Sequence, residues 1–204
     1  QDSFELAKKY YPYVDNRLMP DIAFQVGPII DVDRYPLPKS NFEVKKVDIL
    51  LLLRSDKESA LKDQRSSIFI QNRLNFIGRE DVTFRIVDWK DRYNYFYHSG
   101  IFAFQNKAQK IEFDFDLRIS EAISLYSTGK IIITDRLHGS IFSFLMYKPH
   151  VFVDQIYKKI EKTREVAFNS SQACGDKMNL MYESAKDLNE GIDLAVSFLD
   201  RYYL

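Results

Sequence analysis

Residues 130–153 read KIIITDRLHGSIFSFLMYKPHVFV, and their pattern indicates the fold class of the chain. The run 131–133 consists of isoleucine alone, which is typical of a buried strand in a parallel sheet. The run 141–146 is apolar on nearly all sides, as expected of a short helix packed between other layers. Pro149 ends this helix, and the apolar residues 151–153 predict a second strand. The stretch therefore predicts a strand, a helix and a further strand of a parallel α/β sheet.

A polar turn over 134–140 separates the predicted strand from the predicted helix. Such a turn leaves the carboxyl end of a parallel strand, where open α/β sheets bind ligands, and the helix that follows favours an anion. Arg136 adds a charged, forked donor that suits phosphate or carboxylate. His138 carries an imidazole, a group that can transfer a proton near neutral pH. Gly139 allows the backbone to turn tightly or to approach another group closely.

Strands and helices alternate through the rest of the chain. The sequence predicts strands over 22–26, 47–53 and 83–89, and helices over 2–11, 60–76, 117–128 and 187–199. Ser55 and Glu58 form a capping box that predicts a helix start directly after the strand 47–53, and Gly129 is expected to end the helix 117–128. This alternation predicts a mostly parallel sheet with helices on both faces. Right-handed crossovers would bring Arg54, Asp88 and Arg136 to the same sheet edge.

Composition bounds the function. Of the 204 residues 46% are hydrophobic, enough to bury a core without a disulfide or a metal. Lys and Arg total 29, as do Asp and Glu, so the chain lacks the basic excess of a nucleic-acid-binding protein. Cys174 is the only cysteine, and no Cys or His spacing suits a metal, so we expect neither a disulfide nor a metal site. No apolar run approaches the roughly 20 residues of a membrane-spanning helix.

The chain begins with Gln1-Asp2-Ser3-Phe4 rather than with Met or a signal peptide, so we expect a fragment or a processed piece of a longer protein. Prolines among charged residues over 27–44 predict an extended crossover segment. We therefore assign residues 1–40 to the end of an N-terminal domain and its linker, with most of that domain missing. Residues 41–204 would form a Rossmann-like C-terminal domain that carries the site. Any membrane anchor would lie upstream.

The segment 134–139, Thr-Asp-Arg-Leu-His-Gly, resembles the signature of the polysaccharide pyruvyltransferase family. The match includes its context, an Ile-rich strand before it and an apolar helix that ends at Lys148-Pro149. The segments Val-Phe-Val-Asp at 151–154, Lys159-Ile160 and Pro-Asp-Ile-Ala-Phe at 20–24 are also similar to the family pattern. The resemblance extends over most of the chain, and its specific part is the Arg-Leu-His motif.

This resemblance implies a GT-B-like architecture and transfer of the enolpyruvyl unit of phosphoenolpyruvate to a sugar of a glycan. His138 would be the catalytic residue, as general acid. The residues expected to bind substrate are Arg136, Leu137, Arg54, Gly139 and Lys159. Phosphoenolpyruvate is then a donor substrate and no cofactor is expected. Relatives in eukaryotes would work in the Golgi lumen, and those in bacteria in the cytoplasm.

Other interpretations remain open for several of these residues and for the function. Lys159 competes with Lys158 and Lys162 and could belong to a solvated charge run. His98 and His150 lack supporting residues nearby in sequence and are expected to be structural or exposed. A sugar-nucleotide glycosyltransferase of the same architecture is a second candidate, although the two glutamates separated by seven residues that mark many such enzymes are absent. A non-catalytic glycan-binding module is the third.

Overall fold

The computed structural model describes residues 2–15, 45–56, 59, 61–88, 118–153 and 181–203. Its elements are α1 (Asp2–Tyr10), β1 (Val47–Leu52), the 3-10 helix η3 (Lys62–Gln64), α2 (Ser67–Phe76), β2 (Phe84–Val87), β3 (Gly129–Thr134), α5 (Leu137–Leu145), β4 (His150–Val153), β5 (Tyr182–Ala185) and α7 (Leu188–Tyr202). A further helix covers residues 118–126, before β3. Strands and helices thus alternate as the sequence predicts.

The strands form one five-stranded sheet in the order β2-β1-β3-β4-β5, and every neighbouring pair is parallel. β1 and β3 lie side by side, with Ile49 opposite Ile131 and Leu51 opposite Ile133. Both strands are buried along almost their whole length. A strand that is covered on both faces needs apolar side chains at consecutive positions, which is why these segments lack polar alternation.

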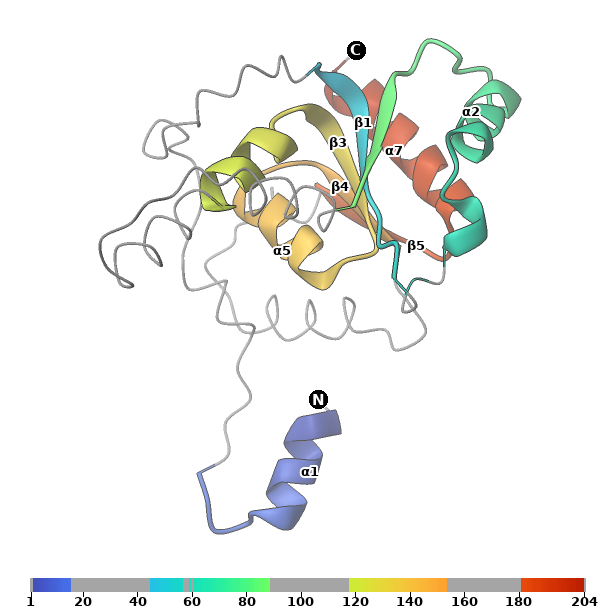
Figure 1. The fold of residues 1–204 in the computed structure, drawn as a ribbon. Coiled ribbons are helices and arrows are strands. Elements are labelled where there is room, and N and C mark those ends of the chain that lie inside the picture. Colours follow the sequence, from blue (N-terminus) through green and yellow to red (C-terminus); the bar gives the residue numbers. More distant parts are fainter. Residues whose placement is uncertain are drawn as a thin grey trace, which may run out of the picture.

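Helices cover both faces of the sheet (Figure 1). On one face α2 and α7 pack over Ile49 and Leu51, through residues such as Ile70 and Ile192. On the other face the helix 118–126 and α5 pack over the alternate positions of β1, Leu50 and Leu52. The predicted α/β fold with a parallel sheet and helices on both faces is therefore confirmed.

Helix α2 starts later than predicted. The sequence places its start at the capping box of Ser55 and Glu58, but the helix begins at Ser67, and the hydroxyl of Ser66 caps it by accepting from the backbone N–H of Phe69. The chain before it passes instead through η3. Ser55 does not cap a helix because its hydroxyl donates to the carboxylate of Asp88.

One further boundary and one strand differ from the prediction. Gly129 belongs to β3 rather than ending a helix, and a Cβ there would lie 2.6 Å from the Cβ of Leu50. Glycine at this position therefore serves the close approach of β3 to β1. The strand β5 was missed because its central residues, Glu183 and Ser184, are exposed and polar. The helix after it was found, and Asp187 caps it by accepting from the N–H of Glu190.

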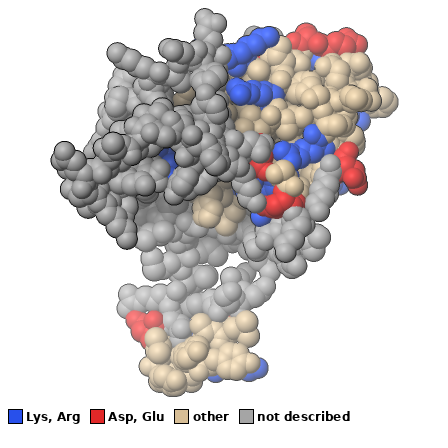
Figure 2. Space-filling view, in the orientation of Figure 1, with Lys and Arg blue, Asp and Glu red and all other residues tan. Residues whose placement is uncertain are grey.

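Two predicted segments lie outside the described residues, namely the strand 22–26 and the crossover 27–44. The division of the chain into 1–40 and 41–204 therefore stays a prediction. Among the helices that the structure describes, none is long and apolar enough to cross a membrane. Acidic and basic side chains both occur across the described part of the face in Figure 2, in line with the net charge of zero.

Candidate functional site

The sheet order defines where a ligand would bind. β1 is followed by α2, which packs on one face, and β3 is followed by α5, which packs on the other face. β1 and β3 are neighbours, so the connections after them diverge to opposite sides of the sheet. In open α/β sheets the crevice at such a switch point, outside the carboxyl ends of the strands, is the usual ligand site.

Two buried carboxylates connect the strand ends at this edge of the sheet. Asp135 follows β3 directly, and its Oδ1 accepts from the backbone N–H of Arg54 at 2.9 Å. The other oxygen of Asp135 accepts from the hydroxyl of Ser59 at 3.1 Å. Asp88 follows β2 and accepts from the backbone N–H of Ser55 at 2.7 Å. The prediction that Arg54, Asp88 and Arg136 share one sheet edge is confirmed.

Arg136 lies at the centre of this edge. Its Nη2 donates to the Oδ1 of Asp88 at 2.5 Å, and its side chain keeps 22% of its surface exposed. Its Nε atom is buried and has no hydrogen-bond partner in the part of the chain that the structure describes. The guanidinium is therefore held from one side by a buried acid while part of it still reaches solvent.

Helix α5 starts at Leu137, so the predicted polar turn 134–140 shrinks to Asp135 and Arg136. Arg136 is the N-cap residue, and it has no acceptor with which to cap the helix. Among the described residues no side-chain cap of α5 is present, because its N-cap residue Arg136 makes no capping bond, and its first turn holds no acidic residue, whereas α2 and α7 are both capped by side chains. An uncapped helix start presents backbone N–H groups and a partial positive charge, both of which favour an anion.

His138 is the second residue of α5 and is exposed. It follows Arg136 by two positions, so both side chains leave the backbone within the first turn of this helix. Leu137 between them is half-buried. The site thus combines a partly exposed arginine side chain, a helix start without a described side-chain cap and an exposed imidazole, which together can hold an anion and exchange a proton.

Gly139 permits the tight junction between β3 and α5. A Cβ at this position would lie 2.5 Å from the Oγ1 of Thr134. That hydroxyl donates to the carbonyl of Leu52 on β1 at 2.9 Å and accepts from the N–H of Arg136 at 3.1 Å. The close approach expected for Gly139 is present, and it is an approach to a side chain that fixes the backbone of Arg136.

Two predicted binding residues, Arg54 and Lys159, remain to be placed. Arg54 lies at the carboxyl end of β1, and its Nε and Nη2 both donate to the carboxylate of Asp56 at 3.0 Å. Arg54 thus reaches the predicted edge, but one side of its guanidinium is already engaged, and it does not lie at the start of α2. Lys159 lies outside the described residues.

The opposite end of the sheet contains a second histidine in a different setting. His150 begins β4 and is 3% exposed. Its Nε2 lies 3.1 Å from the Oγ of Ser140, and its Nδ1 lies 3.0 Å from the carbonyl of Lys148. Burial lowers the pKa of His150 to about 4, so the ring is neutral at pH 7. Of the two expected alternatives for His150, structural or exposed, the structure shows the structural one.

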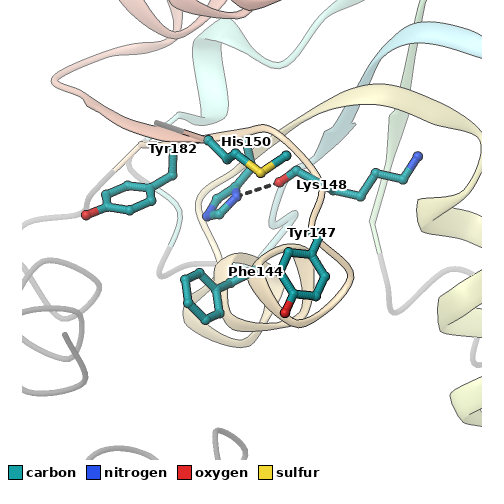
Figure 3. Close-up of a pocket in the computed structure, with 6 residues that line it drawn as sticks. Phe144, Tyr147, Lys148, His150 and Tyr182 are labelled. Carbon is teal, nitrogen blue, oxygen red and sulfur yellow. Dashed lines mark hydrogen bonds between the residues drawn. The ribbon is translucent and has the colours of Figure 1, made fainter. Parts of the chain in front are cut away.

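A shallow pocket of about 180 Å³ adjoins His150 at this end (Figure 3). The side chains of Phe144 and Tyr147 at the end of α5 and of Tyr182 on β5 surround it. This pocket lies at the end of the sheet opposite Arg136 and His138.

The sequence argument did not predict the contacts of Asp135 and Thr134. Asp135 accepts hydrogen bonds from the backbone N–H of Arg54 and from the hydroxyl of Ser59. Burial raises the pKa of the Asp135 carboxyl, and the N–H of Arg54 opposes that shift. The usable signal was position: a polar residue that directly follows a wholly buried strand commonly bonds to the neighbouring strand's loop.

The chain is similar in sequence to proteins described as pyruvyl transferases. The sequence model of the family described as polysaccharide pyruvyl transferase matches residues 1–155. The chain is also similar to the protein named pyruvyl transferase 1 of Schizosaccharomyces pombe, with 28% identity over 141 residues. That alignment covers 67% of this chain but only 30% of the relative, so the chain corresponds to less than a third of its length.

Proposed function

The chain belongs to the polysaccharide pyruvyl transferase family, and we propose that its protein moves the enolpyruvyl unit of phosphoenolpyruvate onto a glycan sugar as a pyruvate ketal. The observation that carries the proposal is the position of Arg136 and His138. Both lie in the first turn after β3, at the carboxyl end of the sheet and beside its switch point. The ketal product, the donor and the GT-B-like arrangement of the whole protein are part of this proposal.

The donor brings two anionic groups, a carboxylate and a phosphate. Arg136 can engage one of them through the donors that Asp88 leaves available, and the uncapped start of α5 can receive the other. Arg54 lies on the same edge and could add a third contact if the donor displaces part of its pairing with Asp56. Fixed positive groups of this kind stabilise the charge that develops on the departing phosphate.

We assign His138 the role of general acid, because it is exposed in the first turn after β3. A protonated imidazole would give its proton to the methylene carbon of phosphoenolpyruvate, which makes the adjacent C2 electrophilic. A sugar hydroxyl then adds to C2, the C–O bond to phosphate breaks, and inorganic phosphate leaves. A second hydroxyl of the same sugar adds to C2 and closes the ketal. The two hydroxyl protons restore the imidazolium and protonate the phosphate, so the reaction consumes neither oxidant nor reductant.

The acceptor is a terminal galactose-like or mannose-like residue in this proposal. Most of the acceptor contacts would come from parts of the protein beyond the described residues. A sugar-nucleotide glycosyltransferase would also use an anion site at a helix start, but the family match and the Arg-Leu-His motif favour pyruvyl transfer. A non-catalytic glycan-binding module would bind carbohydrate without releasing phosphate.

Phosphate release tests the proposal directly. Full-length protein is incubated with phosphoenolpyruvate and a panel of β-galactosides and mannosides, and the product is examined by mass spectrometry for an added pyruvate ketal. The proposal expects phosphate release that depends on one class of acceptor, together with thermal stabilisation by phosphoenolpyruvate. Stabilisation by nucleotide sugars alone, with no phosphate release, would replace it with the glycosyltransferase interpretation.

A further inference from the structure

Asp88 is the most deeply buried acid on this sheet edge among the described residues. It follows β2, and its side chain has no exposed surface. Taking a carboxylate out of water is costly unless other groups compensate its charge. Here Oδ2 accepts from both the N–H and the hydroxyl of Ser55, and Oδ1 accepts from Nη2 of Arg136. One carboxylate thus connects the ends of β2, β1 and β3.

The contacts of Asp88 divide between its two oxygens. Oδ2 is held by Ser55, on the loop after β1, which fixes the plane of the carboxylate. Because the carboxylate plane is fixed, Oδ1 is held at one position, where it accepts a hydrogen bond from Nη2 of Arg136. A guanidinium is planar and rigid, so holding one of its nitrogens restricts the directions in which its other donors point.

Stability alone is a weak explanation for this pair. Replacing a buried ion pair with apolar side chains is often neutral or stabilising, because desolvation offsets the attraction. The pair also leaves the buried Nε of Arg136 without an acceptor among the described residues. This arrangement removes a carboxylate from water and still leaves one N–H group of Arg136 without an acceptor among the described residues. Its effect on the orientation of Arg136 explains it better than stability does.

We infer that Asp88 is a positioning residue, which aims the guanidinium of Arg136 at the anionic donor. The inference rests on the proposed function, because it assigns Arg136 to donor binding. Asp88 itself does not contact the donor; it acts through Arg136, and Ser55 supports it from behind. Without the carboxylate, Arg136 would remain charged, but its guanidinium would adopt several orientations. Phosphoenolpyruvate would then bind only to the fraction of molecules with the correct orientation.

The molecule offers a matched control in a second Arg–Asp pair. Arg73 on α2 donates to Asp193 on α7 through Nε, at 2.8 Å, and through Nη2. This pair joins two helices on the outer side of one face, and both side chains are partly exposed, at 24% and 40%. Asp193→Asn therefore removes the same kind of pair at a place that does not adjoin the proposed site.

The experiment measures KM for phosphoenolpyruvate, kcat and the thermal midpoint in the full-length protein, its Asp88→Asn and Asp193→Asn variants, and Arg136→Ala with and without Asp88→Asn. We expect Asp88→Asn to raise KM roughly ten- to a hundredfold, the range of a lost hydrogen bond to a charged group, with a smaller change in kcat. Asp193→Asn should leave KM unchanged. In the Arg136→Ala background, Asp88→Asn should raise KM no further, because a residue that acts only through Arg136 has nothing left to position.

An unchanged KM in Asp88→Asn would overturn the inference, and so would an independent further increase in the double variant. If Asp88→Asn does not fold, Asp88→Glu provides the same comparison, because it keeps the charge but displaces it by a methylene group. Failure of both variants to fold would show a structural role and overturn the inference. A wild-type protein that does not consume phosphoenolpyruvate would instead refute the proposed function, and the inference would fall with it.

Discussion

The two ends of the sheet each contain a histidine and a basic residue, but these side chains differ in burial. At the amino end, His150 is buried with both ring nitrogens at hydrogen-bond distance, and Lys148 donates from Nζ to the carbonyl of Gly129 at 2.9 Å. At the carboxyl end, His138 is exposed and Arg136 is only partly enclosed. The amino end satisfies its polar atoms internally and stabilises the fold. At the carboxyl end the acids Asp88 and Asp135 are also buried and bonded, but His138 and part of the Arg136 side chain reach solvent, as the proposed donor site requires.

The largest expected effect is on the chemical step. His138→Ala should lower kcat about 10²–10⁴-fold, the usual contribution of a general acid, while phosphoenolpyruvate still binds. Steady-state phosphate release and calorimetric titration of phosphoenolpyruvate measure the two quantities separately. The matched substitution His150→Gln should retain turnover. Full activity of His138→Ala would remove the general-acid assignment.

The next effect is on donor binding. Arg136→Ala should weaken phosphoenolpyruvate binding roughly ten- to a hundredfold, because one or two hydrogen bonds to a charged group contribute about 1.5–3 kcal/mol. The Kd from calorimetry of the full-length protein gives this value. Arg79→Ala is the control, since Arg79 also forms ion pairs, with Asp81 and Asp200, away from the sheet edge. Equal Kd values for wild type and Arg136→Ala would exclude Arg136 from the donor site.

A smaller effect is expected on stability at the junction of β3 and α5. Gly139→Ala would place a Cβ 2.5 Å from the Oγ1 of Thr134, and we expect a loss of about 1–3 kcal/mol in the free energy of unfolding. Gly191→Ala in α7 is the control, because its Cβ would meet Val153 only at 3.4 Å and alanine favours a helix. Urea unfolding measures both. Similar stabilities of the two variants would contradict the packing described for Gly139.

The smallest effect concerns the pH dependence of stability at the amino end. Because burial holds the pKa of His150 near 4, below its ordinary 6.5, the unfolded chain takes up a proton at this residue before the folded one does. Stability should therefore fall as the pH drops from 6.5 towards 4, by roughly 1 kcal/mol between pH 7.5 and 6 from this residue. His150→Gln should show a shallower fall than wild type in urea unfolding across this range. Parallel curves would mean that His150 is not buried in the neutral form.

The strands and their arrangement followed from the sequence because burial on both faces requires continuous apolar runs such as 131–133. The ends of helices were less predictable. Ser55 and Glu58 satisfy the local pattern of a cap, yet the N–H and hydroxyl of Ser55 both donate to Asp88, 33 residues away, and the helix begins only at Ser67. The strand β5 carried too little apolar signal to be found.

The candidate site was predictable in location but not in its connections. Residues that follow buried parallel strands must gather at one edge, so Arg54, Asp88 and Arg136 could be placed together from order alone. Which acid would hold which base depends on side-chain geometry across loops far apart in sequence. Sequence order alone does not identify the partner of Arg136, which in the structure is Asp88, 48 residues away.

Hydrogen–deuterium exchange of the full-length protein with and without phosphoenolpyruvate, followed by mass spectrometry of its peptides, tests the central claim most directly. If the donor binds at the carboxyl end of the sheet, amides at the start of α5 and after β1 should exchange more slowly when it is present. Amides around Lys148 and at the start of β5, at the amino end, should not change. Slower exchange confined to the amino end, with none at the start of α5, would contradict the account.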